Sequence, residues 1–180
     1  EEDKVTLICF GDGAAETGVF HESLNFAALK RLPVVFFCEN NLYSVYSPLP
    51  VRQPQRSIAG IAAGHGLECH AGDGNDVESV LAATRQAVAA ARSGRGPVFL
   101  EFATYRWREH CGPGYDNHIG YRSEDEFLEW KAKCPVEHQR IALTAQRQLT
   151  PEDDKAIRDE IADEIREAFH FAKSSPFPNP

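Results

Sequence analysis

Residues 5–18 read VTLICFGDGAAETG, an apolar run followed at once by a loop with three glycines. A continuous apolar run is typical of a strand buried on both faces of a parallel sheet. A glycine-rich loop after such a strand is a common place for a bound phosphate, because glycine lets the backbone approach the ligand. The stretch therefore predicts a fully buried strand over residues 5–10 and a phosphate site at its carboxyl end.

Helices and strands are expected to alternate after this loop. Irregular, proline-containing sequence covers 39–55, and a polar loop rich in glycine and histidine covers 106–122. The remaining patterns predict helices over 16–30, 57–64 and 76–92, and strands over 34–38, 67–70 and 97–105. This alternation predicts an α/β fold with a mostly parallel sheet flanked by helices.

The last third of the chain is expected to be helical. Capping-box sequences at 123–126 and 150–153 each open a helix. The second helix carries an apolar stripe, which indicates packing within the protein or a contact with another subunit: Ile157, Ile161, Ile165 and Phe169. We expect an α/β domain over 1–122, a helical extension packed on it over 123–173, and a flexible tail over 174–180.

Composition is that of an ordinary globular protein, with 42% hydrophobic and 26% charged residues. The net charge of -8 argues against a nucleic-acid surface, which needs clustered Lys and Arg. The five cysteines form no CxxC pair, which predicts reduced thiols. No signal peptide or membrane-length apolar segment is recognisable. Because the chain lacks methionine and its first strand begins almost at once, we expect a fragment or a processed product.

Three kinds of phosphate site compete for residues 11–18. A dinucleotide-binding loop has the pattern G-x-G-x-x-G, but Glu16 stands where the third glycine should be. A P-loop needs lysine and then serine or threonine after its last glycine, but Val19 and Phe20 follow Gly18. In the third kind, Asp12 binds a metal ion that holds the phosphate, and this requires a second oxygen ligand elsewhere.

Asn41 is the candidate for that second ligand, because it follows the next apolar strand. The segment between the two sites contains one helix and one strand, a crossover that makes the strands parallel. Their carboxyl ends would bring Asp12 and Asn41 to one crevice, where open α/β sheets bind ligands. Carboxylate and amide oxygens suit Mg²⁺ or Ca²⁺ rather than zinc, and Mg²⁺ also takes phosphate oxygens and water.

The GDG at 11–13 and the NN at 40–41, at this separation, resemble the thiamine-diphosphate motif. The surrounding sequence GDGAAETGVFHESLNFAALKRLPVVFFCENNLYSVYSP is similar to the alpha subunit of the two-subunit 2-oxo acid dehydrogenase E1 components. These are the pyruvate, branched-chain and acetoin dehydrogenases. The similarity continues through GPVFLEFATYRWREH and GYRSEDEFLEW, and it implies the thiamine-diphosphate-binding fold.

The resemblance implies thiamine diphosphate and Mg²⁺ as cofactors. The metal ligands would be the side chains of Asp12 and Asn41 and the backbone carbonyl of Tyr43. His110 would reach the cofactor phosphates and the active site. The residues along the diphosphate would be Gly11, Gly13 and Ala14.

The activity implied is oxidative decarboxylation of a 2-oxo acid, or cleavage of acetoin, with acyl transfer to a lipoyl group. The partners would be an E1 beta subunit, in an α2β2 assembly, and a lipoyl-bearing E2 acyltransferase. In this family a glutamate of the beta subunit activates the cofactor, and a long segment of the alpha subunit before the GDG strand contributes cofactor and substrate contacts. We therefore expect the isolated chain to be inactive. The expected location is the cytoplasm, or the mitochondrial matrix in a eukaryote.

Other functions remain open at this point. One is a transketolase-like thiamine-diphosphate enzyme, against which the sequences ENN-x-Y and TYRWREH argue. Another is a non-catalytic subunit that keeps the fold without the cofactor, against which Asp12 and Asn41 argue. The substrate stays undecided among pyruvate, branched-chain 2-oxo acids and acetoin, because the sequence after His110 departs from the pyruvate enzymes.

Simple structural roles also compete for the same residues. A second GDG, at 72–74, has Phe102 where a second ligand would stand, so we expect a turn and a helix start there. The pair Asn40-Asn41 could by itself be a polar turn after a strand. His110 could form only a surface ion pair with Glu109.

Overall fold

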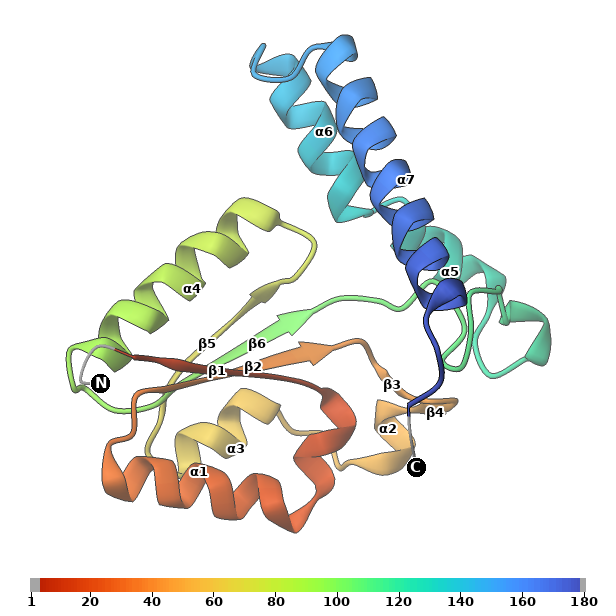
Figure 1. Ribbon diagram of the computed structural model, residues 1–180. Coiled ribbons are helices and arrows are strands. Elements are labelled where there is room, and N and C mark those ends of the chain that lie inside the picture. The colour runs from red at the N-terminus through yellow and green to blue at the C-terminus, as the bar shows by residue number, and fades with distance from the viewer. Residues whose placement is uncertain (1–3, 179–180) are drawn as a thin grey trace. The chain divides into compact units, whose positions relative to one another are not determined.

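The computed structural model describes residues 4–178, and the chain divides into two compact units after Pro135. The first unit contains a four-stranded sheet in the order β1-β2-β6-β5, in which all paired strands are parallel (Figure 1). Its strands are β1 (Thr6–Gly11), β2 (Val34–Asn40), β5 (Glu68–Asp73) and β6 (Val98–Ala103). The predicted α/β fold with a parallel sheet and flanking helices is confirmed.

Helices cover both faces of this sheet (Figure 1). One face packs against α1 (Gly18–Lys30) and α3 (Ile58–Gly64), in a core that includes Phe36, Cys38 and Phe99. The other face packs against α4 (Val77–Arg92), in a core that includes Val35, Val98 and Leu100. Successive β2 residues therefore point into opposite cores, as the period of a strand requires.

The remaining elements of the first unit lie in its connections. They are the 3₁₀ helices η1 (Asp12–Glu16) and η2 (Asn117–Ile119), the hairpin β3 (Tyr43–Ser44) and β4 (Ser47–Pro48), and the helices α2 (Leu49–Arg52) and α5 (Glu124–Lys131). The segment predicted as irregular over 39–55 thus contains a short hairpin and one helical turn. Pro50 lies in the first turn of this helix, where the missing N–H of proline costs no helical hydrogen bond.

The first strand differs from its prediction, because it is largely exposed rather than fully buried. β1 is an edge strand that pairs with β2 alone among the described residues. The side chains of Leu7 and Ile8 are 49% and 40% exposed. An apolar run identifies a strand but cannot show how many neighbours that strand has.

The second GDG forms the turn and helix start that the sequence predicts. The Asp73 side chain accepts a hydrogen bond from the Asn75 N–H at 2.8 Å, which closes a turn after β5. Asp76 then caps α4, since its side chain accepts from the Ser79 N–H. This GDG therefore stabilises a local connection and serves as an internal comparison for the first one.

The second unit consists of two helices, α6 (Pro135–Ala145) and α7 (Pro151–Ser174). The first residue of α6, Pro135, is the last residue of the first unit. Both hydrogen bonds of the predicted capping box at Thr150 and Asp153 are present. The apolar stripe of α7 stays half exposed, from 49% at Ile157 to 63% at Phe169. The predicted boundary after Arg122 and the predicted flexible tail stay predictions. Across residues 4–178, no helix is long and apolar enough to cross a membrane.

Candidate functional site

The two segments proposed to bind a metal follow adjacent parallel strands. β1 and β2 run in register, with Gly11 paired to Glu39. Asp12 begins η1 directly after β1, and Asn41 comes directly after the last residue of β2. The predicted crossover is therefore present, and it places both residues at the carboxyl edge of the sheet.

Asp12 is a buried carboxylate with only part of its hydrogen-bonding capacity used. Its side chain is 1% exposed, and its Oδ2 forms an ion pair with Arg52 of α2. Its Oδ1 is buried and has no hydrogen-bond partner among the described residues. A buried carboxylate oxygen without a partner is costly, so this atom fits a site that receives a cation.

The two glycines beside Asp12 lie in different surroundings, open at Gly11 and tightly packed at Gly13. A Cβ atom added at Gly11 would meet nothing within 4 Å, and one added at Gly13 would lie 2.8 Å from the Ser44 Oγ. Neither η1 nor α1 has a side-chain cap: the residue before η1 is Gly11, which has no side chain, and the Thr17 hydroxyl before α1 donates instead to the Ala14 carbonyl at 2.8 Å. Uncapped helix N-termini with close-approach glycines suit a diphosphate.

Asn41 and Tyr43 lie on a tight turn after β2. The Asn41 Oδ1 accepts a hydrogen bond from the Tyr43 N–H at 3.1 Å, and Leu42 between them has a positive φ of 71°. Tyr43 is paired with Pro48, which has no N–H to donate to the Tyr43 carbonyl. An amide oxygen and a backbone carbonyl, added to the Asp12 carboxylate, make the all-oxygen donor set that Mg²⁺ prefers. The residues present therefore fit the group that the resemblance implies.

A cavity of about 510 Å³ opens beside this turn. Asn41 lines it together with Glu39, Thr104, Tyr105 and Arg106. All five follow or end strands β2 and β6, which places the cavity at the carboxyl edge of the sheet. Ligands of open α/β sheets bind at this edge.

His110 is not brought to these residues by any contact of the described chain. It is exposed, and it makes no hydrogen bond or ion pair within residues 4–178. Its neighbour Glu109 instead accepts a hydrogen bond from the Gly114 N–H at 3.1 Å. The alternative role of His110, a surface ion pair with Glu109, is therefore absent from this part of the chain.

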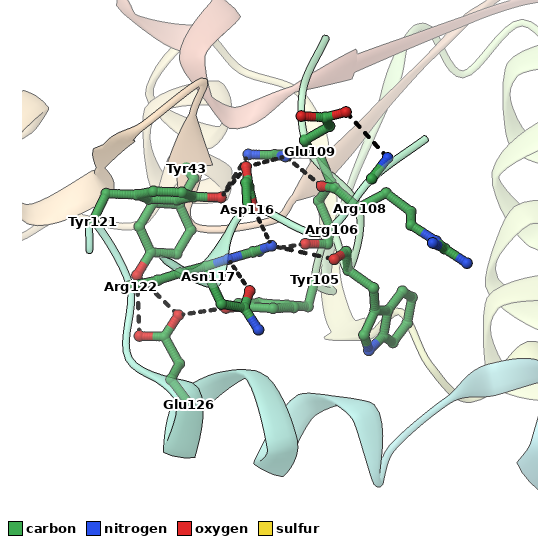
Figure 2. A network of polar contacts seen from close by, with 12 residues as sticks. Tyr43, Tyr105, Arg106, Arg108, Glu109, Asp116, Asn117, Tyr121, Arg122 and Glu126 are labelled. Atoms are coloured by element: carbon green, nitrogen blue, oxygen red, sulfur yellow. Dashed lines mark hydrogen bonds and ion pairs between the residues drawn. The ribbon is translucent and has the colours of Figure 1, made fainter. Parts of the chain in front are cut away.

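A buried polar network in the loop after β6 was not predicted from the sequence (Figure 2). Arg122 and Asp116 form an ion pair in which both side chains are 1% exposed. Arg122 also donates to the Trp107 carbonyl at 3.2 Å, and Tyr121 donates to Asp116 at 2.9 Å. Burial raises the pKa of Asp116, but the Tyr121 hydrogen bond and the Arg122 and Arg106 charges outweigh it and hold that pKa below its usual range.

Glu126 of α5 connects this network to the turn after β2 (Figure 2). It accepts hydrogen bonds from the hydroxyls of Tyr43, at 2.8 Å, and Tyr105, at 2.9 Å. Burial and this hydrogen bond raise the pKa of Tyr43 to about 12. The predicted capping box at Ser123 is therefore only half formed, since Ser123 caps the Glu126 N–H while the Glu126 carboxylate faces the tyrosines.

Two further contacts were also missed. Arg52 lies against Asp12 and Glu16, and no spacing pattern connects a residue of α2 to η1. His21 and His65 lie side by side, with 3.2 Å between Nδ1 and Nε2. No cluster of three metal-ligating His, Cys, Asp or Glu side chains occurs within the described part of the chain.

Comparison with known proteins agrees with the resemblance. A family model described as "Dehydrogenase E1 component" matches residues 1–180. The chain is 37% identical over 178 residues to the pyruvate dehydrogenase E1 component subunit alpha of Rhizobium meliloti (98% of this chain, 50% of the relative). It is 33% identical over 180 residues to the 2-oxoisovalerate dehydrogenase subunit alpha of Bacillus subtilis (100% and 54%).

A mitochondrial relative is similar over the same length. The 2-oxoisovalerate dehydrogenase subunit alpha of Homo sapiens is 36% identical over 179 residues (99% of this chain, 40% of the relative). The chain thus spans about half the length of the curated relatives that it matches. Because the family match extends from its first residue to its last, the chain belongs to the dehydrogenase E1 component family.

Proposed function

We propose that the chain is the diphosphate- and Mg²⁺-anchoring part of a thiamine-diphosphate-dependent E1 alpha subunit. The reaction would be oxidative decarboxylation of a 2-oxo acid, or cleavage of acetoin, with acyl transfer to a lipoyl carrier. The observation that carries the proposal is the unpartnered buried Oδ1 of Asp12 beside the strand end that bears Asn41. The similarity to alpha subunits of pyruvate and 2-oxoisovalerate dehydrogenases supports the same reaction class.

The chain's own contribution is to bind and orient. Asp12 and Asn41 would hold Mg²⁺ by their side chains and Tyr43 by its carbonyl, while the backbone of Gly11, Gly13 and Ala14 would lie along the diphosphate. When bound, thiamine diphosphate would supply an electron-accepting centre that allows a 2-oxo acid to lose carbon dioxide. Fixing its diphosphate end positions that centre, which contributes to rate by orientation rather than by proton transfer.

The proposed function also involves His110 and two partner proteins. His110, on the exposed loop after β6, would reach the cofactor phosphates and the active site when the assembly is complete. An E1 beta subunit would supply the glutamate that activates the cofactor, in an α2β2 assembly, and a lipoyl-bearing E2 would accept the acyl group. The chain alone would then have no activity.

The experiment uses the complete alpha subunit co-expressed with its beta partner. Thiamine diphosphate and Mg²⁺ are supplied, and reduction of an artificial electron acceptor is followed with pyruvate, branched 2-oxo acids and acetoin in turn. We expect turnover of one substrate class, lost in Asp12→Asn. Asp73→Asn, in the second GDG, is the matched control and should keep the activity, because Asp73 only closes a turn.

The outcomes separate the open alternatives. Bound cofactor with no turnover of any of these substrates would contradict the 2-oxo acid assignment and favour a transketolase-like reaction. Failure of the assembled protein to bind thiamine diphosphate at all would favour a non-catalytic subunit. Equal activity in Asp12→Asn and the wild type would contradict the metal site.

A further inference from the structure

Arg52 is held by three acceptors around the proposed metal site. Its Nη2 contacts the Asp12 Oδ2, its Nη1 contacts the Glu16 Oε1, and its Nε donates to the Ser47 carbonyl at 2.9 Å. Its side chain is 10% exposed, so this guanidinium is nearly enclosed. A guanidinium whose Nε, Nη1 and Nη2 atoms all contact acceptors is held in one position, unlike a mobile side chain on the surface.

The charges of this cluster do not balance. Asp12 and Glu16 contribute two negative charges and Arg52 one positive charge, which leaves one negative charge in a cluster where Asp12 is 1% and Glu16 30% exposed. The unpartnered Oδ1 of Asp12 marks the atom where this excess is unsatisfied. Gln53 adds a neutral donor to Glu16, at 3.0 Å, and so leaves the charge unchanged.

We propose that Arg52 is the counterion of Asp12 before a divalent cation binds, and that the cation and Arg52 compete for this carboxylate. The inference rests on the proposed function of Asp12 as a metal ligand. When the cation binds the Asp12 carboxylate, Arg52 keeps its contacts with Glu16 and the Ser47 carbonyl. Arg52 therefore stays in place, and only its Nη2 loses its acceptor. A cation without diphosphate therefore binds against a competing positive charge.

A bound diphosphate would offset this repulsion between the cation and Arg52, because it would offer a new acceptor to the Nη2 that no longer contacts Asp12. A Cβ atom at Gly13 would lie 3.7 Å from the Arg52 Nη1, so the guanidinium lies beside the backbone along which the diphosphate is proposed to run. Arginine pairs well with phosphate. Arg52 thus couples the two ligands: each binds more tightly when the other is present, by the same factor.

The test measures Mn²⁺ binding by electron paramagnetic resonance, with and without thiamine diphosphate, on the assembled subunits. In Arg52→Gln we expect Mn²⁺ alone to bind about tenfold more tightly, and the gain in Mn²⁺ affinity caused by thiamine diphosphate to fall about tenfold, within the usual range of such couplings. Arg56→Gln, at an exposed arginine of the same segment, should behave as the wild type. Mn²⁺ affinities that are unchanged in Arg52→Gln would overturn the inference.

A second variant keeps the test decisive if Arg52→Gln does not fold. Glu16→Gln leaves Asp12 as the sole carboxylate partner of Arg52, so Mn²⁺ alone should bind several-fold more weakly; equal or tighter binding would overturn the inference. Asp12→Asn tests the proposed metal site separately from the proposed role of Arg52. If it retains Mn²⁺ binding, the proposed metal site is wrong; if it loses binding while both other variants match the wild type, only the role of Arg52 is wrong.

Discussion

Tyr43 and Glu126 are joined by a hydrogen bond although 83 residues separate them in the chain. The Tyr43 hydroxyl lies 2.8 Å from the Glu126 Oε1 and 3.0 Å from its Oε2. Tyr43 comes two residues after Asn41, and Glu126 lies in α5. The turn that carries two of the three proposed metal ligands is thus fixed from outside by a helix of the same unit.

Removing this hydroxyl should destabilise the fold measurably. In Tyr43→Phe the Glu126 carboxylate keeps Tyr105 but loses one buried donor, which costs about 1–3 kcal/mol. Urea unfolding followed by circular dichroism measures the change. Tyr46→Phe is the control, because the Tyr46 side chain is partly exposed and its hydroxyl has no hydrogen bond within residues 4–178. Equal effects of the two substitutions would contradict the role of the Tyr43 hydroxyl.

The raised pKa of Tyr43, about 12, also predicts a loss of stability at high pH. Its pKa in the unfolded chain is about 10. Because the folded value is higher, the associated stability is present below pH 10 and is lost as the pH rises toward 12. Burial and hydrogen bonding also raise the pKa values of Tyr105 and Tyr121, so ultraviolet titration should show several late tyrosinate steps, and Tyr43→Phe should remove one of them. A titration curve that is identical in the variant would refute the assignment.

The buried pair of Arg122 and Asp116 should be sensitive to the loss of either partner. Arg122→Met leaves Asp116 as a buried carboxylate without its principal cation, which costs about 3–5 kcal/mol. Arg158→Met removes an exposed pair on α7 and should cost only about 0.3–0.5 kcal/mol. Denaturant unfolding compares the two, and a small effect of Arg122→Met would show that the pair contributes little.

Acid should weaken the same pair. The pKa of Asp116 is lowered in the folded protein, so its contribution is present above the unfolded value of about 3.9 and is lost as the pH falls through the folded value. Asp116→Asn has no charge to lose, so its unfolding free energy should fall less steeply below pH 4. Unfolding free energies that fall equally with pH in the variant and the wild type would contradict this expectation.

Three glycines should respond differently to alanine, because their surroundings differ. Gly74→Ala places a Cβ 2.8 Å from the Ala103 carbonyl oxygen, a backbone atom, and should destabilise by about 1–3 kcal/mol. Gly13→Ala meets the Ser44 hydroxyl, which can rotate, and should cost less. Gly11→Ala meets nothing within 4 Å, so its thermal stability should be unchanged while thiamine diphosphate binds more weakly. Unweakened cofactor binding in Gly11→Ala would argue against a diphosphate at this loop.

The sequence was sufficient for those features that depend on neighbouring residues. The apolar runs at β1 and β2, with a helix between them, predict two adjacent parallel strands, and this places Asp12 and Asn41 at one edge of the sheet. The capping box at Thr150 and the turn at Asp73 are likewise local. In each case the interaction lies within a few residues or follows from the handedness of one crossover.

Contacts between distant segments could not be predicted in the same way. The ion pair of Arg52 with Asp12 depends on how α2 returns across η1. The bond from Tyr43 to Glu126 depends on where α5 packs, and the half-formed capping box at Ser123 is its consequence. The exposure of β1 depends on its place in the strand order, which the apolar run does not encode.

The edge position of β1 has a practical consequence for work with the isolated chain. Within residues 4–178 the sheet ends at this strand, so its outer backbone N–H and C=O groups have no strand partner there. Beside them lie the half-exposed side chains of Leu7 and Ile8. An open, apolar strand edge is a template on which another copy can add by intermolecular pairing. Concentrated solutions of the chain will therefore tend to precipitate through β1, and a lysine placed at Leu7 would be the first change to make for solubility.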